Sequence, residues 1–248
     1  MRLQNKVALI TGGASGFGAE IARRFVREGA SVVIMDLNGD GAIKVAAEIG
    51  NAKALKGDVT LRNDIDEAVQ LTTKTFGRLD IVINNAGWTH RNKPLSEVTE
   101  QEFDRIYAIN VKSIFHMVHA ITPLMSKQGG GSIINIGSTA GIRPRPGLTW
   151  YNASKGAVNL VSKSLAVELA PFKIKVNCVA PVIGETGLLE AFMGTPDTPE
   201  NRARFISTIP LGRLSRPADV ASACVFLASD DAEFLTGVIL PVDGGRTV

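Results

Sequence analysis

Tyr151 and Lys155 form the residue pair in this chain whose types and spacing suit proton transfer. The apolar pattern predicts a helix from about Trp150 to Ala170, and residues four apart lie on one face of a helix. A nearby ammonium group favours tyrosinate and would lower the tyrosine pKa from its ordinary value near 10. Such a phenol can act as a general acid or base. Taken alone, a Tyr–Lys pair on a helix is more often a surface contact.

Polar residues also follow two predicted buried strands. Ser138 comes after the strand predicted for residues 132–136, and its hydroxyl could donate a hydrogen bond to a substrate oxygen. The strand predicted for residues 79–83 ends in Asn84-Asn85-Ala86-Gly87. Open α/β sheets bind ligands at the carboxyl ends of their strands, so this tetrapeptide suits close packing against a ligand. Ordinary turn chemistry would explain it equally well.

A glycine-rich turn near the N-terminus indicates the scaffold that would hold these groups. The segment from Thr11 to Gly18 follows an apolar run at residues 7–10 and leads into a helical pattern from Ala19. A strand, a glycine turn and a helix N-terminus together form a binding site for a dinucleotide pyrophosphate. The cofactor contacts predicted in this turn are Gly12, Ser15, Gly16, Phe17 and Gly18.

Asp36 ends the strand predicted for residues 31–35, and an acid about 20 residues beyond the glycine turn hydrogen-bonds the adenosine ribose in such units. Its negative charge would repel a 2′-phosphate, and neither Ser15 nor Leu37 offers a positive charge that would compensate for this repulsion. Asp36 therefore favours NAD over NADP, although it could instead cap the helix predicted for residues 42–49. Asp58 similarly lies near the adenine or caps the helix predicted for residues 61–75.

The composition is that of an ordinary globular protein. Of 248 residues, 45% are hydrophobic and 21% charged, and the net charge of +3 is scattered, which indicates neither nucleic acid nor a membrane as partner. No apolar stretch is long enough for a bilayer span or a signal peptide. Cys178 and Cys224 lie far apart in apolar company, which predicts buried thiols in a cytoplasmic protein. His116 and His119 lack a third ligand, so we predict no metal site.

Strand and helix patterns alternate along the whole chain. This alternation predicts an α/β fold, with a single doubly wound, Rossmann-type parallel sheet that carries helices on both faces. A capping-box signature at Thr99 opens a helix expected to reach Met125, and Pro217 opens a last helix through Ala228. Because no linker or composition break divides the chain, we expect residues 1–248 to form one domain.

These motifs occur in the order and at the spacing of the classical short-chain dehydrogenases/reductases, and the chain resembles that family over nearly its whole length. The resemblance rests on Thr11-Gly12-x-x-x-Gly16-x-Gly18, Asn84-Asn85-Ala86-Gly87, Asn110, Ser138, Tyr151-x-x-x-Lys155 and Pro181. It implies a seven-stranded sheet that binds a nicotinamide dinucleotide across its carboxyl edge. It also argues against a mere surface contact for Tyr151.

The resemblance further implies a role for each matching residue. Tyr151 would be the general acid/base, and Lys155 would bind the nicotinamide ribose and keep the pKa of Tyr151 low. Ser138 would polarise the substrate oxygen, and Asn110 would hold a water that relays protons. Thr186 would bond the nicotinamide carboxamide. The other cofactor contacts that we predict are Leu37, Asp58, Val59, Asn85, Ala86, Gly87 and Pro181.

One residue departs from the family pattern. Val182 follows Pro181 where the family usually has glycine, and valine is excluded from backbone angles that glycine adopts. The backbone around residues 184–186 is therefore expected to differ from the family's.

Substrate specificity is expected in three pieces: residues 88–93, residues 142–150, and a substrate lid at about residues 185–209. The lid's apolar residues, with Trp88 and Trp150, suggest a pocket for a partly apolar or aromatic substrate, although they could only pack the lid onto the body. The apolar lid residues are Leu188, Leu189, Phe192 and Met193. Arg143 and Arg145 could meet a substrate carboxylate or a phosphopantetheine carrier, or simply be solvated.

These observations predict an NAD(H)-dependent oxidoreductase that interconverts a secondary alcohol and a ketone. The alternative within the family is a 3-oxoacyl-thioester (acyl-carrier-protein) reductase. Such reductases usually use NADPH, and Asp36 argues against that cofactor. A non-catalytic dinucleotide-binding subunit is a third hypothesis, disfavoured by the intact Ser138, Tyr151 and Lys155. The resemblance implies a homotetramer, in which apolar positions such as Phe115, Val161 and Leu165 would be covered.

Overall fold

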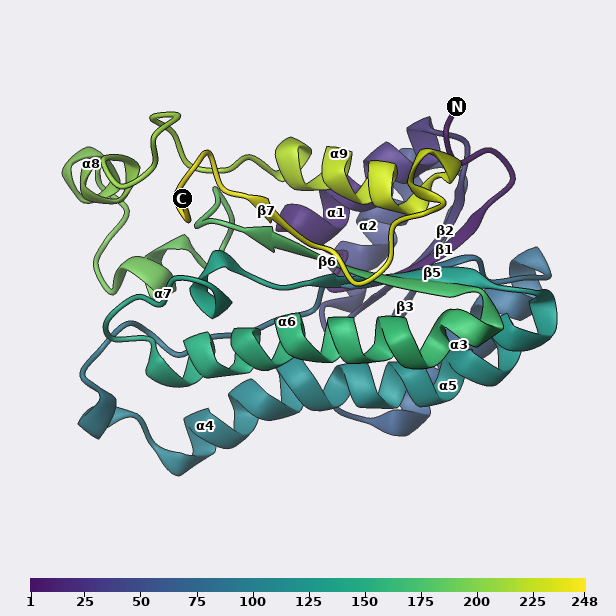
Figure 1. Cartoon of the computed structure of the whole chain (residues 1–248), viewed down its shortest axis with the longest axis horizontal. Helices are drawn as coiled ribbons and strands as arrows, with labels where there is room; N and C mark the ends of the chain where they lie inside the picture. Colours follow the sequence, from purple (N-terminus) through teal and green to yellow (C-terminus); the bar gives the residue numbers. More distant parts are fainter.

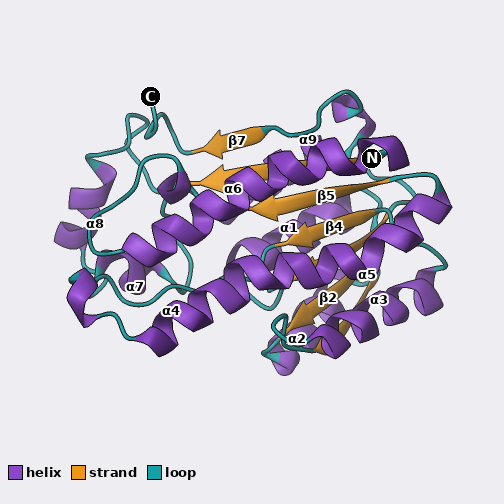
Figure 2. Cartoon of the chain, turned by 60° about the horizontal axis from the view of Figure 1, so that its bottom comes forward, coloured by secondary structure: helices purple, strands orange, loops and turns teal.

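A computed structural model describes all 248 residues, and its seven strands form one parallel sheet in the order β3-β2-β1-β4-β5-β6-β7 (Figures 1 and 2). The predicted doubly wound α/β fold is confirmed. The strands are β1 (Val7–Thr11), β2 (Ser31–Asp36), β3 (Ala52–Lys56), β4 (Ile81–Asn84), β5 (Gly131–Ile136), β6 (Ile174–Pro181) and β7 (Ile239–Val242).

Helices cover both faces of the sheet, as Figure 1 shows. Helices α1 (Gly16–Arg27), α2 (Gly39–Ile49) and α9 (Pro217–Ala228) lie on one face, and α3 (Arg62–Phe76), α5 (Ser113–Gln128) and α6 (Thr149–Leu169) on the other. Successive residues of β1 serve the two layers, since Ala8 and Ile10 enter one core and Leu9 the other. This alternation explains why the strand is apolar at every position.

The helix predicted from Thr99 to Met125 differs in detail. The capping box is present and opens α4 (Glu100–Tyr107), but a π-helical segment at Ala108–Lys112 separates α4 from α5. Helix α5 then runs to Gln128 and ends at Gly129, which adopts a positive φ. The π-helical turn contains Asn110, and such insertions are frequent at functional sites. Single 3₁₀ turns occur at Leu95–Glu97, Thr139–Gly141, Ala170–Phe172 and Asp230–Ala232.

The predicted lid lies beyond the carboxyl ends of the strands and contains two short helices, α7 (Leu189–Met193) and α8 (Pro199–Ile206) (Figure 1). Leu189 and Met193 pack with Val182 and Ile209 in a small apolar cluster of the lid. Because Val182 belongs to the body, the alternative that these residues pack the lid onto the body describes Leu189 and Met193 well.

No helix is long and apolar enough to cross a membrane. Cys178 and Cys224 are buried and form no disulfide.

Candidate active site

A cavity of about 630 Å³ runs along the carboxyl ends of the strands. Of the residues predicted for catalysis and cofactor binding, all but two line it. The two exceptions, Gly18 and Asn110, lie directly behind its wall and support residues that form it. The topology thus gathers groups from the whole chain at one edge of the sheet, as expected for an open α/β fold.

The glycine turn lets neighbouring backbone approach closely at the floor of the cavity. Gly12 has a φ of +66°, and a Cβ there would lie 2.9 Å from the Cα of Ala86. The N-terminus of α1 opens into the cavity at Ser15, whose side chain does not cap the helix, and no acid occupies the first turn. Unpaired N–H groups and the positive end of the helix dipole therefore face the cavity.

Asn85 ties β4 to this turn. Its Nδ2 donates to the carbonyl oxygens of Thr11 and Gly12, both at 2.9 Å, and its backbone N–H donates to Thr11 Oγ1. A Cβ on Gly18 would collide with Gly12 and with the Asn85 amide. The requirement for glycine at position 18 therefore comes from helix–turn packing rather than from the cavity itself.

Asp36 orders the turn and also faces the cavity. Its carboxylate accepts from the N–H of Ala14 at 2.9 Å and of Asn38 at 2.8 Å. Asn38, not Asp36, caps α2, so the helix-capping alternative for Asp36 does not hold. Asp58 accepts from both the backbone and the hydroxyl of Thr60. No cationic side chain lines this end of the cavity.

Ser138, Tyr151 and Lys155 meet in the middle of the cavity wall. Tyr151 and Lys155 are both buried on α6, and Ser138 stands at the end of β5, where it accepts from the N–H of Ala140. The Lys155 ammonium donates to the Ile136 carbonyl oxygen at 2.7 Å and lies 5.9 Å from the centre of the Tyr151 ring. The three residues whose chemistry the sequence singled out are therefore brought together.

The ionisation of this group differs from the prediction. Burial raises the pKa of Tyr151 to about 12, and the hydrogen-bonding interaction with Ser138 lowers it only partly. Burial also lowers the pKa of Lys155 to about 8. The expected lowering of the tyrosine pKa by Lys155 is wrong for this structure, because desolvation of the buried phenol dominates and Ser138, not Lys155, is the group that lowers the pKa.

Asn110 links the cavity wall to α6. Its side chain accepts from the N–H of Trp88 at 2.8 Å and donates to the Trp88 carbonyl oxygen and to Ser154 Oγ. These bonds hold the segment after β4 against the helix that carries Tyr151. The place of Asn110 in a π-helical turn explains why an asparagine, a mediocre helix former, lies there.

The end of the cavity beyond Tyr151 is largely apolar. Leu148, Ile183, Leu188 and Phe192 line it, and the rings of Phe192 and Tyr151 lie 5.1 Å apart. Trp88 also lines the cavity, as predicted.

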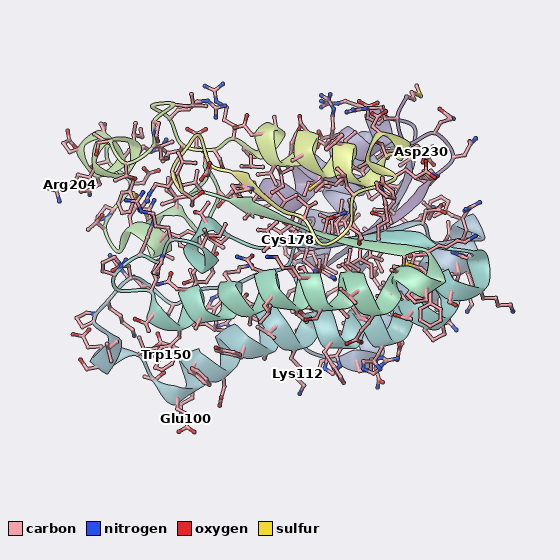
Figure 3. The ribbon with its side chains drawn as sticks, in the orientation of Figure 1. Glu100, Lys112, Trp150, Cys178, Arg204 and Asp230 are labelled. Atoms are coloured by element: carbon pink, nitrogen blue, oxygen red, sulfur yellow. The ribbon has the colours of Figure 1, made fainter.

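Trp150 does not belong to this pocket, contrary to the prediction. It packs edge-on against Phe103, 5.2 Å between ring centres, and lies beside α4 (Figure 3). Its position on α6, next to Tyr151, gives the reason, because adjacent residues of a helix point in different directions.

Sequence reasoning missed Arg105, Leu148 and Ile183 as lining residues. The Arg105 guanidinium lies 4.4 Å from the centre of the Trp88 ring. Its position on a polar helix face gave no signal. Leu148 lies inside a segment already suspected of binding substrate, so the segment was identified but not the residue.

Val182 is accommodated without strain. It is buried, it has no positive φ, and its N–H continues the sheet by donating to Val242. Glycine is needed two residues later, since a Cβ on Gly184 would lie 2.5 Å from the Phe17 ring. Thr186 then reaches the glycine turn, where a Cβ on Gly16 would lie 3.3 Å from its methyl group. The substitution therefore leaves Thr186 at the cavity.

The structure contains no group of three or more His, Cys, Asp or Glu side chains that could hold a metal ion.

Comparisons with known proteins show similarity over nearly the whole chain. A family model described as enoyl-(acyl carrier protein) reductase matches residues 12–247. A 4-formylbenzenesulfonate dehydrogenase of Comamonas testosteroni is 52% identical over 252 residues, with 100% of both chains covered. A cyclopentanol dehydrogenase of the same organism is 40% identical, with 99% of this chain and 98% of the relative covered. The crystal structure of a 3-ketoacyl-(acyl-carrier-protein) reductase from Brucella melitensis, complexed with NADH, superposes with a TM-score of 0.94 at 45% identity and covers 99% of this chain and 100% of that one.

The chain belongs to the classical short-chain dehydrogenase/reductase family, as its motifs predicted. It is an oxidoreductase of that family.

Proposed function

We propose that this enzyme interconverts a secondary alcohol and a ketone by hydride transfer, with NAD(H) as cofactor and Tyr151 as the general acid/base. The observation that carries the proposal is the meeting of Ser138, Tyr151 and Lys155 in the wall of one cavity. One end of this cavity offers a dinucleotide cradle, and the other end is apolar.

The cradle fits NAD. The uncapped N-terminus of α1 offers free N–H groups to a pyrophosphate, and Gly12 leaves room where a Cβ would clash. Asp36 offers carboxylate oxygens at the adenosine end, where a 2′-phosphate would find no cation. The NADH-bound Brucella melitensis relative supports the same choice. Bound NAD(H) supplies or accepts the hydride.

The chain's own residues then handle the proton and orient the substrate. With its pKa raised to about 12, the phenol of Tyr151 holds its proton at neutral pH and can give it to the oxygen of a ketone. Ser138 donates a hydrogen bond to the same oxygen and directs it toward the phenol. Lys155, anchored by Ile136, presents its remaining N–H donors to the cofactor ribose. Asn110 holds the Trp88 segment, and we propose that it also positions the proton-relay water.

Relatives support chemistry at an alcohol or carbonyl carbon. One is named for cyclopentanol, which is a secondary alcohol, and another for an aromatic compound that carries a formyl group. The largely apolar walls formed by Leu148, Ile183, Leu188 and Phe192 suit a ring or a hydrocarbon next to the reacting carbon.

The test is Tyr151→Phe, which keeps the ring and its contact with Phe192. Loss of general acid–base catalysis lowers kcat by roughly 10²–10⁴-fold. We expect this loss with little change in NADH affinity, because Lys155 and the glycine turn remain. The control is Tyr107→Phe, since Tyr107 is the only other tyrosine and packs on Phe103 outside the cavity. A Tyr151→Phe enzyme with most of its kcat would end the assignment.

A 3-oxoacyl-thioester reductase is the second candidate, favoured by the likeness to the Brucella melitensis enzyme. Assays with acetoacetyl-CoA and with simple ketones, under the same NADH concentration, separate the two candidates. A kcat/KM far higher for the thioester would favour the reductase.

We also propose a homotetramer. Phe115 on α5 and Leu160 and Val167 on α6 are more than half exposed, and these two helices lie next to each other (Figure 1). Val161 and Leu165, predicted to face water in the monomer, are only partly exposed because they pack toward the core. A cytoplasmic location remains our proposal and is supported by the two buried free thiols.

A further inference from the structure

Three arginines come together where the loop before α6, the lid and the C-terminal tail meet. Arg143 donates from Nη1 to the carbonyl oxygen of Arg246 at 2.9 Å. The guanidinium of Arg145 lies 5.1 Å from the centre of the Phe205 ring on α8. Figure 1 shows the C-terminus returning to the side of the molecule that carries α7 and α8.

This cluster has no ion-pair partner within salt-bridge distance. None of the three arginines forms a salt bridge, and the nearby Asp243 uses its carboxylate on the N–H groups of Gly245 and Thr247. Arg145 Nη2 and two guanidinium nitrogens of Arg246 are shielded from solvent and have no hydrogen-bond partner. Burial, Arg246 and Arg143 together lower the pKa of Arg145 to about 10. Shielded donors without a partner are costly, and an anion near this cluster would lower the cost of holding three positive charges together.

The position of Arg145 in the cavity indicates that a substrate, rather than the cofactor, would carry such an anionic group. The charged side chains that line the cavity are Asp36, Asp58, Arg105, Lys155 and Arg145. The two acids belong to the adenosine end. Arg105 is exposed, and its guanidinium lies over the Trp88 ring. Arg145 lies on the loop that leads through Leu148 to Tyr151 and lines the cavity, so its guanidinium belongs to the substrate end.

We propose that Arg145, supported by Arg246, binds a carboxylate or sulfonate of an aryl ketone or aryl secondary alcohol, and thereby selects anionic aromatic substrates. This inference rests on the function proposed above. The planar guanidinium fork matches both oxyanions, and the ring of such a substrate suits the apolar wall next to Phe192. An anion bound beside Arg145 would relieve the repulsion among the three arginines.

The experiment compares para-acetylbenzoate with its neutral isostere para-acetylbenzamide as substrates reduced with NADH. We expect wild-type kcat/KM to be at least about tenfold higher for the carboxylate, which corresponds to about 1.4 kcal/mol. Arg145→Met should lower kcat/KM for the carboxylate at least about tenfold more than for the amide, mainly through KM. Arg145→Lys keeps the charge but lacks the planar guanidinium, so its kcat/KM for the carboxylate should fall between those of the wild type and Arg145→Met. It replaces Arg145→Met as the test variant if the methionine variant does not fold.

Arg204→Met is the matched control, because Arg204 is an exposed arginine of α8 that does not line the cavity and lies at the outer edge of the lid (Figure 3). It removes the same charge from the same region. If Arg204→Met and Arg145→Met lost kcat/KM for the carboxylate equally, the effect would come from net charge alone and the proposal would be overturned. Equal wild-type kcat/KM for the two ketones, or equal losses on both in Arg145→Met, would also overturn it, and in these cases the proposed function still stands.

A binding measurement separates failure of this inference from failure of the proposed function. Benzoate and benzamide are added to the NADH complex, and the thermal shift is recorded. If neither ketone is turned over, stabilisation by benzoate alone, lost in Arg145→Met, still supports the anion site. No difference between benzoate and benzamide overturns it.

Discussion

Lys155 provides the sharpest test of how this site ionises. Burial lowers its pKa from 10.5 to about 8 in the structure, so about half of the side chain is a neutral amine at pH about 8. A dinucleotide whose ribose oxygens accept from the ammonium stabilises the charged form and raises this pKa again. Cofactor binding should then take up a proton above pH about 8.

The sign and size of the effect follow from linkage. Because the complex holds more protons than the free enzyme, Kd for NADH rises with pH above about 8, by up to tenfold per pH unit. If binding restored the ordinary lysine pKa in full, Kd at pH about 9.5 would be about 30-fold higher than at pH about 7, or about 2 kcal/mol. Tyr151 and Cys178, with pKa values raised to about 12 and about 11, titrate above this window.

The assay is a titration of NADH fluorescence at constant ionic strength across this pH range, together with calorimetry in buffers of different ionisation enthalpy to count protons. Lys155→Met should bind NADH more weakly and show a flat pH profile. The control is Lys163→Met, an exposed lysine of the same helix, which should behave like the wild type. A wild-type Kd independent of pH, with no proton uptake at pH about 9, would refute the reasoning.

Three further predictions concern the cofactor, the packing and the assembly. The wild type should use NAD(H) at least roughly tenfold better than NADP(H) in kcat/KM, Asp36→Ala should narrow that gap, and equal use of both cofactors by the wild type would contradict the role of Asp36. Gly184→Ala should cost about 1–3 kcal/mol of unfolding free energy and weaken NADH binding by displacing Phe17, whereas Gly187→Ala, whose Cβ meets nothing within 4 Å, should leave the unfolding free energy unchanged in thermal melts. Light scattering should give about four times the 26.3 kDa chain mass, and Phe115→Glu should lower it.

The lid prediction from the sequence can be sharpened. Its glycines and prolines indicated an irregular segment, and the structure adds α7 and α8 with a small apolar cluster. Leu188 and Phe192 face the cavity, so ligands would add contacts to the same segment. Hydrogen exchange across residues 185–209 should be fast in the free enzyme and slow with NADH and substrate bound. Equal protection in both states would exclude a mobile lid.

The sequence predicted most of the fold because each helix or strand has its own spacing of apolar residues and its own residues that mark its ends. The final helix begins at Pro217 and ends at Ala228 as expected, since proline at a first helical turn is a local signal. The π-helical insertion at Asn110 was not visible, because it depends on bonds to Trp88 and Ser154, which are distant in sequence.

In the candidate site, too, the sequence predicted which residues meet but not the properties that depend on contacts with distant residues. Residue types at family spacing placed Ser138, Tyr151 and Lys155 in one cavity. Their pKa values could not be predicted, because a four-residue spacing gives proximity but not burial. Likewise, the requirement for glycine at position 184 comes from Phe17, which approaches from the other end of the chain.

The opposite pKa shifts of Tyr151 and Lys155 have one physical cause and one functional consequence. Burial disfavours charge on both groups, so the free site approaches a neutral phenol beside a partly neutral amine. Cofactor binding that charges Lys155 would place a cation 5.9 Å from the Tyr151 ring only when the hydride partner is present. That cation would stabilise tyrosinate, so the phenol would become a usable base for alcohol oxidation in the complex and remain inert without it. In Lys155→Met, the Kd for NADH should therefore no longer rise above pH about 8. The rate of alcohol oxidation by this variant should also no longer depend on an ionisation near that pH.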